Sequence, residues 1–424
     1  MIAAIAPIVI ALLSLIIRLI NLSTPKGMVF DEVYYVDGAR DLLKYGVEVT
    51  GSAPEFIVHP PIGKWCIALG IKLFGDHEFG WRIVGAILGT AMILLIALIA
   101  HRLFYSPLLT ALASALMAID GMLLVHSRTA LLDIFLAFFI LTATYFWVVR
   151  KYWLTGLFLG LAIGTKWSAL YFLALFGAIA LYRTFTHHTG KTLIAPTLKR
   201  FVQFGVLPLS VYLASWSGWF LSKRGWDRQW SPSALNSLWH YHAQMWDFHT
   251  NLVTKHSYQA NPWNWLIMGR PTSFFYESPK GCGAKLCAQE VLAMGTPLLW
   301  WIGTIAIALV FSLWFRSVVV SRFDPALNIV VIGMVAGYLP WFFFQRRTTF
   351  TFYAIIFEPF LILAIVYCAK MALDTSRGNI LARSAITLVF IALLANFIYF
   401  LPIFTGQIIS YEAWQNRMWF PSWI

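Results

Sequence analysis

The chain has 424 residues, of which 60% are hydrophobic and 12% charged, and its formal net charge is +13. A soluble domain has about twice that share of charged residues, so the composition excludes an ordinary soluble protein. The basic residues lie in short stretches between apolar runs and form no stripe on a soluble face. This pattern argues against a nucleic-acid-binding protein and is typical of the positive-inside bias of membrane proteins.

Apolar runs of about 20 residues recur along the chain, and each is long enough to cross a bilayer as a helix. The first run lacks the basic n-region of a signal peptide, so we read it as a span. The sequence therefore predicts an all-α integral membrane protein that forms one domain over residues 1–424, with about eleven crossings. The expected spans are Ile2–Asn21, Trp81–Leu103, Leu108–Val125, Ala130–Val149, Leu154–Lys166, Ser168–Tyr182, Phe201–Leu221, Val291–Phe315, Asn328–Phe344, Phe350–Lys370 and Ala385–Phe404.

Charge predicts how these spans are oriented. If the spans alternate, most Lys and Arg of the connections fall on one side, which the positive-inside rule makes cytoplasmic. Two long connections, 22–80 and 222–290, then face outward, where we expect the functional residues. Leu154–Lys166 and Ser168–Tyr182 are each short for a crossing, and we expect a hairpin with Lys166 at its apex.

The first outward segment opens with the adjacent carboxylates Asp31 and Glu32. After them, Tyr35, Ala39 and Leu42 recur at helical spacing with polar residues between, which predicts an amphipathic helix lying in the membrane interface. An acidic pair in a loop is most often solvated surface, so this pair alone is a weak indication of a site.

Further along, the stretch from His59 to Lys64 contains Pro60 and Pro61, which stiffen the chain and exclude helix at that point. The histidine fits either a site or a rigid turn in which it is incidental. Arg82 lies at the outer end of the second span, where a cation is either a snorkelling anchor or a ligand.

Charged side chains also occur at membrane depth. Asp133 lies a few residues inside an apolar run, and it either pairs with Arg128 or Arg82 or takes part in catalysis. Lys166, in the outer leaflet, presents the same choice between a structural and a functional role.

Arg346 and Arg347 lie in a short outward turn, against the positive-inside trend, which calls for an anionic partner such as a lipid headgroup or a substrate phosphate. Outward carboxylates together with cations at membrane depth suit transfer from a lipid-linked sugar phosphate. The cations would hold the phosphate leaving group, and a carboxylate would deprotonate the attacking hydroxyl.

The four cysteines are too few for a disulfide scaffold. Cys282 and Cys287 lie close together in the second outward segment, and we expect them to form a disulfide in an oxidising compartment. No cluster with the spacing of metal ligands is evident, and we expect neither a metal nor a cofactor.

Taken together, these motifs resemble the protein O-mannosyltransferase family of GT-C membrane enzymes. The resemblance covers most of the chain, and the motifs occur in the family's order. A β-trefoil MIR domain, found in eukaryotic members, does not fit in 222–290, so the chain resembles the bacterial type. The matching pieces are Phe30-Asp31-Glu32, His59-Pro60-Pro61 with Gly63-Lys64, Arg82, Ser127-Arg128 through Asp133, Gly164-Thr165-Lys166-Trp167, His256-Ser257-Tyr258, Asn261-Pro262-Trp263 and Arg270-Pro271.

The resemblance implies a polyprenyl-phosphate-mannose donor, Ser or Thr hydroxyls of secreted proteins as acceptors, and transfer with inversion at the extracytoplasmic face of the cell membrane. It makes Asp31 the base with Glu32 beside it, and Arg82 a support of the first loop. Donor contacts are expected from a group of charged residues, and loop or acceptor contacts from a second group. The first group is Arg82, Arg128, Asp133, Lys166, Arg346 and Arg347; the second is His59, Pro60, Lys64, His256, Tyr258 and Arg270.

Two other functions stay open. A related GT-C transferase would use the same carrier chemistry on a lipid or glycan acceptor, but the motif from His256 to Arg270 argues against it. A secondary transporter would show repeat-related halves with broken helices, and the sequence shows none. Expected partners are membrane lipids and the protein translocation machinery, and no nucleic acid.

Overall fold

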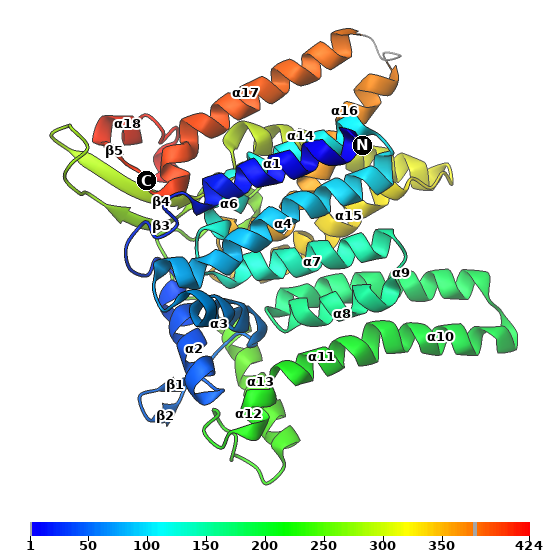
Figure 1. Ribbon diagram of the computed structural model, residues 1–424. Helices are drawn as coiled ribbons and strands as arrows, with labels where there is room; N and C mark the ends of the chain where they lie inside the picture. Colours follow the sequence, from blue (N-terminus) through cyan, green and yellow to red (C-terminus); the bar gives the residue numbers. More distant parts are fainter. Residues whose placement is uncertain (1, 376–379) are drawn as a thin grey trace.

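The structure, a computed structural model, describes residues 2–375 and 380–424. Its body is a bundle of apolar helices that run roughly along one direction (Figure 1). In this bundle α4 packs against α1, α5 and α7, α7 packs against α8, and α14 packs against α16. The helices are α1 (Ile2–Leu19), α4 (Glu78–Phe104), α5 (Pro107–Ala118), α6 (Gly121–Ser127), α7 (Leu132–Val148), α8 (Tyr152–Ile163), α9 (Leu170–His187), α10 (Ile194–Phe201), α11 (Leu207–Ser215), α14 (Pro297–Val319), α15 (Pro325–Gly337), α16 (Glu358–Thr375) and α17 (Ile380–Thr405).

Polar residues mark the points where these helices begin. Ser106 caps α5 by accepting a hydrogen bond from the Leu109 amide, and Asp324 caps α15 through the Ala326 amide. Each is followed by proline at the first helical position, which suits the unpaired first turn. Asp120 caps α6 through the Met122 amide, so the helix that enters at Pro107 ends before it and restarts with a bend of 60°.

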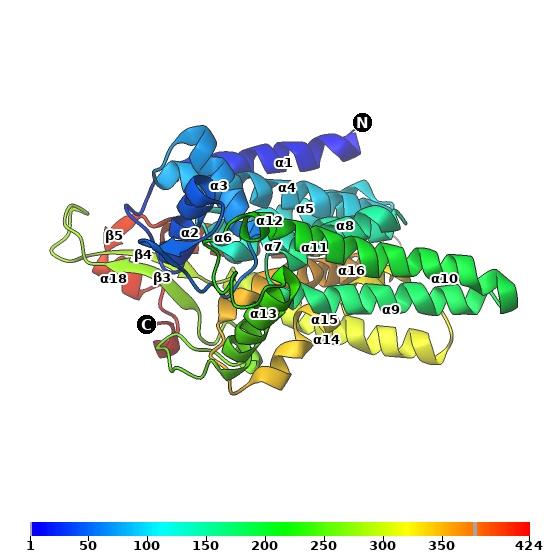
Figure 2. The same cartoon turned by 90° about the horizontal axis from the view of Figure 1, so that it is seen from below.

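Among the described residues, five helices are long and apolar enough to cross a membrane, or six if α5 and α6 form one bent span. The predicted single span Leu108–Val125 is this broken pair. α8 and α9 form the expected hairpin, with Lys166 between them. The total of eleven crossings stays a prediction. The two termini do lie at opposite ends of the bundle, as any odd number of crossings gives (Figures 1 and 2).

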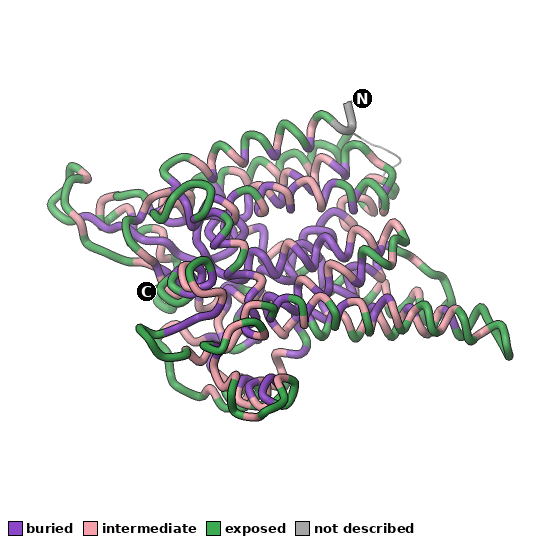
Figure 3. The backbone as a smooth tube through the Cα atoms, turned by 60° about the horizontal axis from the view of Figure 1, so that its bottom comes forward, coloured by how far each residue is buried: buried purple, intermediate pink, exposed green. Residues whose placement is uncertain are grey.

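Buried residues gather where the helices meet, and exposed residues follow the outer turns (Figure 3). The outer face of α1 is an example, because Ile8, Leu12 and Ile16 are about half exposed although they are strongly apolar. In water such a surface would be costly, whereas in a bilayer it contacts lipid.

One end of the bundle carries the two long connections. The first connection contains α2 (Glu32–Tyr45), a two-stranded ribbon of β1 (Val49–Thr50) and β2 (Ala53–Pro54), and α3 (Ile62–Phe74). α2 is the predicted amphipathic helix, and it buries Tyr35, Ala39 and Leu42.

The second connection follows α12 (Ser217–Leu221) and contains α13 (Ala234–Asn251), and its last part contributes two strands to a three-stranded antiparallel sheet. The sheet order is β3-β4-β5, with β3 (Thr272–Glu277), β4 (Cys287–Ala293) and β5 (Ile408–Ser410). Because β5 comes from the end of the chain and is followed by α18 (Tyr411–Gln415), the C-terminal segment closes over the second connection.

Candidate active site

Asp31 lies at the beginning of α2, where the chain leaves the turn after α1. Phe30 before it has a φ of +48°, a conformation that is rare for a large side chain. The Phe30 ring stacks on Phe274 at 4.7 Å and meets Phe352 edge-on at 5.5 Å, which holds this turn. Asp31 makes no side-chain capping bond, and its Oδ2 accepts one hydrogen bond from the Tyr35 hydroxyl at 3.4 Å. Its carboxylate therefore keeps most of its acceptor capacity.

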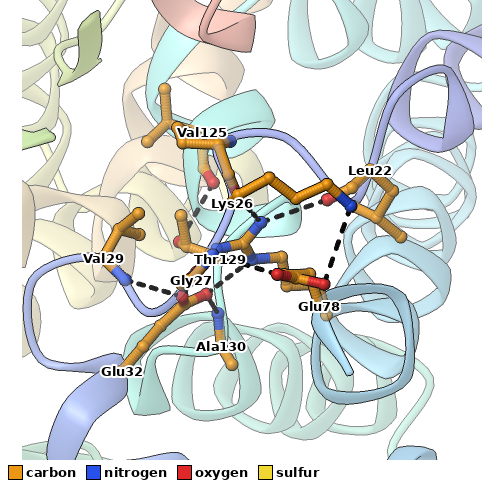
Figure 4. Close-up of polar contacts among 11 residues, drawn as sticks. Leu22, Lys26, Gly27, Val29, Glu32, Glu78, Val125, Thr129 and Ala130 are labelled. Carbon is orange, nitrogen blue, oxygen red and sulfur yellow. Dashed lines mark hydrogen bonds and ion pairs between the residues drawn. The ribbon is translucent and has the colours of Figure 1, made fainter. Parts of the chain in front are cut away.

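Glu32, the next residue, is fully buried and saturated with donors. Arg82 donates from Nε and Nη2 to its two oxygens, both at 2.8 Å. The amides of Val29 and Ala130 donate at 2.9 and 2.7 Å (Figure 4). The structure thus separates the two predicted catalytic carboxylates: Glu32 ties α2 to α4 and to the segment before α7, and only Asp31 keeps free acceptor positions.

The guanidinium groups of Arg82 and Arg128 also donate their hydrogen bonds to protein oxygens. Arg82 Nη1 donates to the carbonyl of Pro25 at 2.9 Å, and Nη2 donates to that of Gly27 at 2.9 Å. Arg128 donates to the carbonyls at the end of α1, including Arg18 at 2.7 Å and Asn21 at 2.9 Å. Neither guanidinium pairs with Asp133, so both partners considered for that carboxylate are wrong.

Asp133 instead pairs with Lys166, whose Nζ lies 2.7 Å from Oδ2. Asp133 is in the first turn of α7, and Lys166 lies between α8 and α9. The ammonium group also lies 5.6 Å from the centroid of the Tyr353 ring. This pair joins the two charged residues at membrane depth whose role the sequence left open between structure and function.

A cavity of about 250 Å³ opens beside this pair. Its charged and polar lining includes Asp133, Lys166, His59, His249 and Arg347, and aromatic side chains make up much of the remainder. The aromatic lining residues are Trp167, Tyr171, Trp246, Trp341, Phe344 and Tyr353. A polar end with an aromatic wall suits a sugar phosphate that is attached to a lipid.

Arg347 and Arg346 differ sharply in placement. Arg347 lines the cavity, and its buried Nε has no hydrogen-bond partner among the described residues. Arg346 is exposed and is not among the residues that line this cavity. Of the two predicted phosphate ligands, Arg347 is therefore the one in position to bind an anion in the cavity.

The surroundings of Asp31 bring its pKa close to neutral pH. Burial raises the pKa of the Asp31 carboxyl to about 6, although the positive charge of Lys166 acts in the opposite direction. Burial also lowers the pKa of His249 to about 4 and holds that of His59 well below its usual value. Both histidines are therefore neutral at pH 7, and Asp31 is the group that can exchange a proton there.

The stretch from His59 to Lys64 brings the first connection against this site. Lys64 is buried and pairs with Glu48 at 2.5 Å, so it is a structural cation. The Ile62 amide donates to the carbonyl of Gly164 at 2.9 Å. Pro60 is buried in this stretch. A Cβ on Gly63 would come within 2.7 Å of the Leu132 side chain, so the position has little room for a larger residue.

The motif of the second connection lies near the site but outside the cavity lining. The His256 ring meets Phe30 at 6.3 Å, so it supports the turn that carries Asp31. Arg270 donates to the Ser257 carbonyl at 2.7 Å and to the Ile424 carbonyl at 2.8 Å, and it stacks on Tyr258. These residues fasten the second connection to the C-terminal segment. Cys282 and Cys287 form the expected disulfide in the β3–β4 hairpin.

Several residues of the cavity were not expected from the sequence. Trp246 and His249 come from α13. They are three residues apart and so lie on the same face of the helix, which is a pattern that the sequence could have shown. Tyr353 lies in a short 3-10 helix, Thr351–Ile356, inside what the sequence suggested was a plain span. No group of three or more potential metal ligands occurs in the part of the chain that the structure describes.

Comparison with known proteins identifies the family. Residues 74–218 match the model described as dolichyl-phosphate-mannose-protein mannosyltransferase, and residues 234–423 match the C-terminal four-transmembrane region of protein O-mannosyltransferase. A polyprenol-phosphate-mannose–protein mannosyltransferase of Mycolicibacterium smegmatis is 34% identical, over 98% of this chain and 92% of that protein.

Two solved structures share the fold. The S. cerevisiae protein O-mannosyltransferase Pmt1-Pmt2 complex bound to the sugar donor superposes with a TM-score of 0.83 at 15% identity, covering 100% of this chain and 93% of that one. ArnT from Cupriavidus metallidurans bound to undecaprenyl phosphate gives 0.57 at 17% identity, covering 93% and 70%. With the matched sequence and the shared GT-C architecture, the chain belongs to the protein O-mannosyltransferase family and is a membrane glycosyltransferase.

Proposed function

We propose that this enzyme transfers mannose from polyprenyl-phosphate-mannose to Ser or Thr hydroxyls of secreted proteins, on the extracytoplasmic face of the cell membrane. The relative from Mycolicibacterium smegmatis carries the donor polyprenol-phosphate-mannose and a protein acceptor in its name. The observation that supports the proposal most strongly concerns Asp31, which does not itself line the cavity. Asp31 keeps free acceptor positions and feels the charges of Lys166 and Asp133, and both of these residues line the cavity. The cavity also holds Arg347, whose Nε has no hydrogen-bond partner among the described residues.

The reaction follows from that arrangement. The acceptor oxygen attacks the anomeric carbon of mannose from the face opposite the phosphate, and Asp31 takes the hydroxyl proton as the new bond forms. The bond from the anomeric carbon to the phosphate oxygen breaks, and polyprenyl phosphate leaves with both electrons. Lys166 and Arg347 stabilise the negative charge on the leaving phosphate. Attack from the opposite face gives inversion, and no cofactor is used.

The placement of the neutral histidines fits these roles of Asp31, Lys166 and Arg347. His59 and His249 line the cavity, their rings lie 5.1 Å apart, and His249 Nε2 lies 2.6 Å from the Val58 carbonyl. A neutral imidazole beside the phosphate site adds no positive charge that would trap the product. Its polar edge can instead orient sugar hydroxyls.

Right-side-out vesicles test the proposal. They are supplied from outside with polyprenyl-phosphate-mannose and a Ser/Thr-rich peptide, and the peptide is then analysed by mass spectrometry. We expect a mass increase of one hexose on Ser or Thr, released by β-elimination. Mannose found only on lipid or glycan would favour the related GT-C transferase, and product formed only in inverted vesicles would overturn the proposed face. Co-purification with translocation machinery is a separate expectation of the same model.

A further inference from the structure

The end of the bundle opposite the catalytic cavity contains a second cavity, of about 460 Å³. It is lined by residues from the end of α7, the α9–α10 hairpin and the connection between α14 and α15, all of which lie toward the right in Figures 1 and 2. α7 begins at Leu132, next to Asp133 of the Asp133–Lys166 pair, and its 17 residues rise about 25 Å along the bundle. The two cavities are therefore separate sites at the two ends of one helix.

Three arginines line this second cavity: Arg150, Arg183 and Arg200. No Asp or Glu lines it among the described residues. The nearest acidic residue in sequence to the lining residue Phe323 is Asp324, and its carboxylate is already occupied by the first amides of α15 and by the Tyr367 hydroxyl at 2.8 Å. The positive charge of the cavity is thus left without a protein counter-ion in the part of the chain described.

The arginines are held by contacts that leave much of their donor capacity free. Arg183 stacks over Trp147 at 5.3 Å and Phe323 at 5.8 Å. Arg200 stacks over Tyr152 at 4.4 Å, and among the described residues it donates only from Nη1, to the Gln203 side chain. Stacking orients a guanidinium plane while its N–H groups remain available, which is the arrangement suited to a planar, two-point grip on a phosphate.

An apolar slot of about 110 Å³ adjoins the basic cavity and shares Arg150, Arg183 and Phe323 with it. The rest of the slot is mostly hydrophobic, with Leu103, Trp147, Val148, Ile329 and Ile332 in its wall. A free phosphate would use only the basic cavity. A lipid fills both spaces, with its phosphate on the arginines and the beginning of an acyl chain in the slot.

α10 places this site at the membrane surface. Ile194, Leu198 and Phe201 are at least 59% exposed and recur along one face of the helix. Pro196 and Arg200, on other positions of the same helix, line the cavity. The apolar face contacts lipid, so a headgroup in that leaflet has direct access to the arginines.

We propose that this cavity binds the phosphate headgroup of an anionic phospholipid, in the leaflet opposite the catalytic cavity. The arginines take the phosphate diester, and the aromatic wall and apolar slot take the glycerol and the proximal acyl chain. Basic pockets between membrane helices bind anionic headgroups by this combination of charge and apolar surface.

The test uses the full-length protein in a neutral detergent, titrated with phosphatidylglycerol, with bound lipid counted by native mass spectrometry. The variant Arg150→Gln/Arg183→Gln removes two cavity charges. The control Lys199→Gln/Arg316→Gln removes two charges from α10 and α14 that do not line either cavity. We expect wild type and control to bind alike, and the cavity variant to bind at least about tenfold more weakly.

Equal loss in the cavity variant and the control would overturn the proposal, because it would make binding a matter of net charge. Inorganic phosphate that displaces the lipid at equal concentration would overturn the lipid assignment in favour of a free anion. Phosphatidylcholine with the same chains should bind more weakly than phosphatidylglycerol. Both double variants must keep the wild-type melting temperature without lipid; if the cavity pair does not, Arg200→Gln repeats the test with one charge.

Discussion

Asp31 and Glu32 are neighbours in sequence, yet their surroundings differ in every respect that matters for chemistry. Glu32 accepts four hydrogen bonds at 2.7 to 2.9 Å and is fully buried. Asp31 accepts one long bond and feels the charges of Lys166 and Asp133. Because successive side chains of a helix point in different directions, Glu32 is held inside the protein by its hydrogen bonds, whereas Asp31 lies within range of the charges on Lys166 and Asp133.

The basic residues differ in the same way, because some have their hydrogen bonds filled by the protein and others line the cavity. Arg82 and Arg128 are satisfied by carboxylate and carbonyl oxygens, which fixes the turn between α1 and α2. Lys166 and Arg347 line the cavity, the first paired with a single carboxylate and the second with its Nε unpartnered among the described residues. In the proposed function, the first kind of cation is structural and costly to leave unpaired, and the second kind binds the substrate phosphate. The predictions below test this division.

The largest effect on stability should come from Glu32→Gln. The substitution leaves Arg82 buried without its counter-charge, and breaking such a pair costs about 3–5 kcal/mol. We expect a clear fall in the melting temperature in detergent, with activity lost in proportion to folded protein. Unchanged stability with lost turnover would place Glu32 in the reaction and break the comparison.

Arg347→Gln should do the reverse. It removes a cation that has no described partner at Nε, so stability should stay near wild type. Loss of a charge-assisted hydrogen bond to the donor phosphate is worth about 1.5–3 kcal/mol, or roughly 10- to 150-fold in kcat/KM. Arg346→Gln is the matched control, since Arg346 is exposed outside the cavity lining. Equal losses in both variants would mean that the turn, and not the Arg347 side chain, matters.

Removal of the disulfide should affect stability modestly. Replacing Cys282 and Cys287 with serine frees a loop of only four intervening residues, which costs about 2 kcal/mol in the chain-entropy model. The hairpin lies outside the cavity, so turnover per folded molecule should be retained. Melting temperature and turnover of the double variant check this together, and a loss of turnover without a loss of stability would count against it.

The pH dependence requires no substitution and sharpens the role of Asp31. Burial raises its pKa to about 6, so the base is protonated below that pH, and kcat/KM should fall about tenfold per pH unit there. The stability contribution has the opposite sign: a carboxyl with a raised folded pKa contributes stability at low pH that is lost as pH rises through about 6. A fall in activity on acidification would therefore not reflect unfolding caused by this group.

The sequence was sufficient for the membrane class, the amphipathic helix after Asp31 and the hairpin with Lys166 at its apex. These depend on local periodicity and charge, which are visible in a short window. It could not pair Asp133 with Lys166, since the partners lie 33 residues apart, one in α7 and the other between α8 and α9. It also missed the break at Asp120, where a single carboxylate caps a new helix inside an otherwise continuous apolar run.

The central claim is that Asp31, and not its neighbour, removes the proton of the acceptor. Single-turnover transfer by Asp31→Asn, with donor already bound, tests it most directly, alongside donor affinity in the same preparation. We predict a rate about 10²–10⁴-fold lower with donor affinity largely retained. A folded Asp31→Asn enzyme with the wild-type single-turnover rate would contradict the claim and make Asp133 the next candidate.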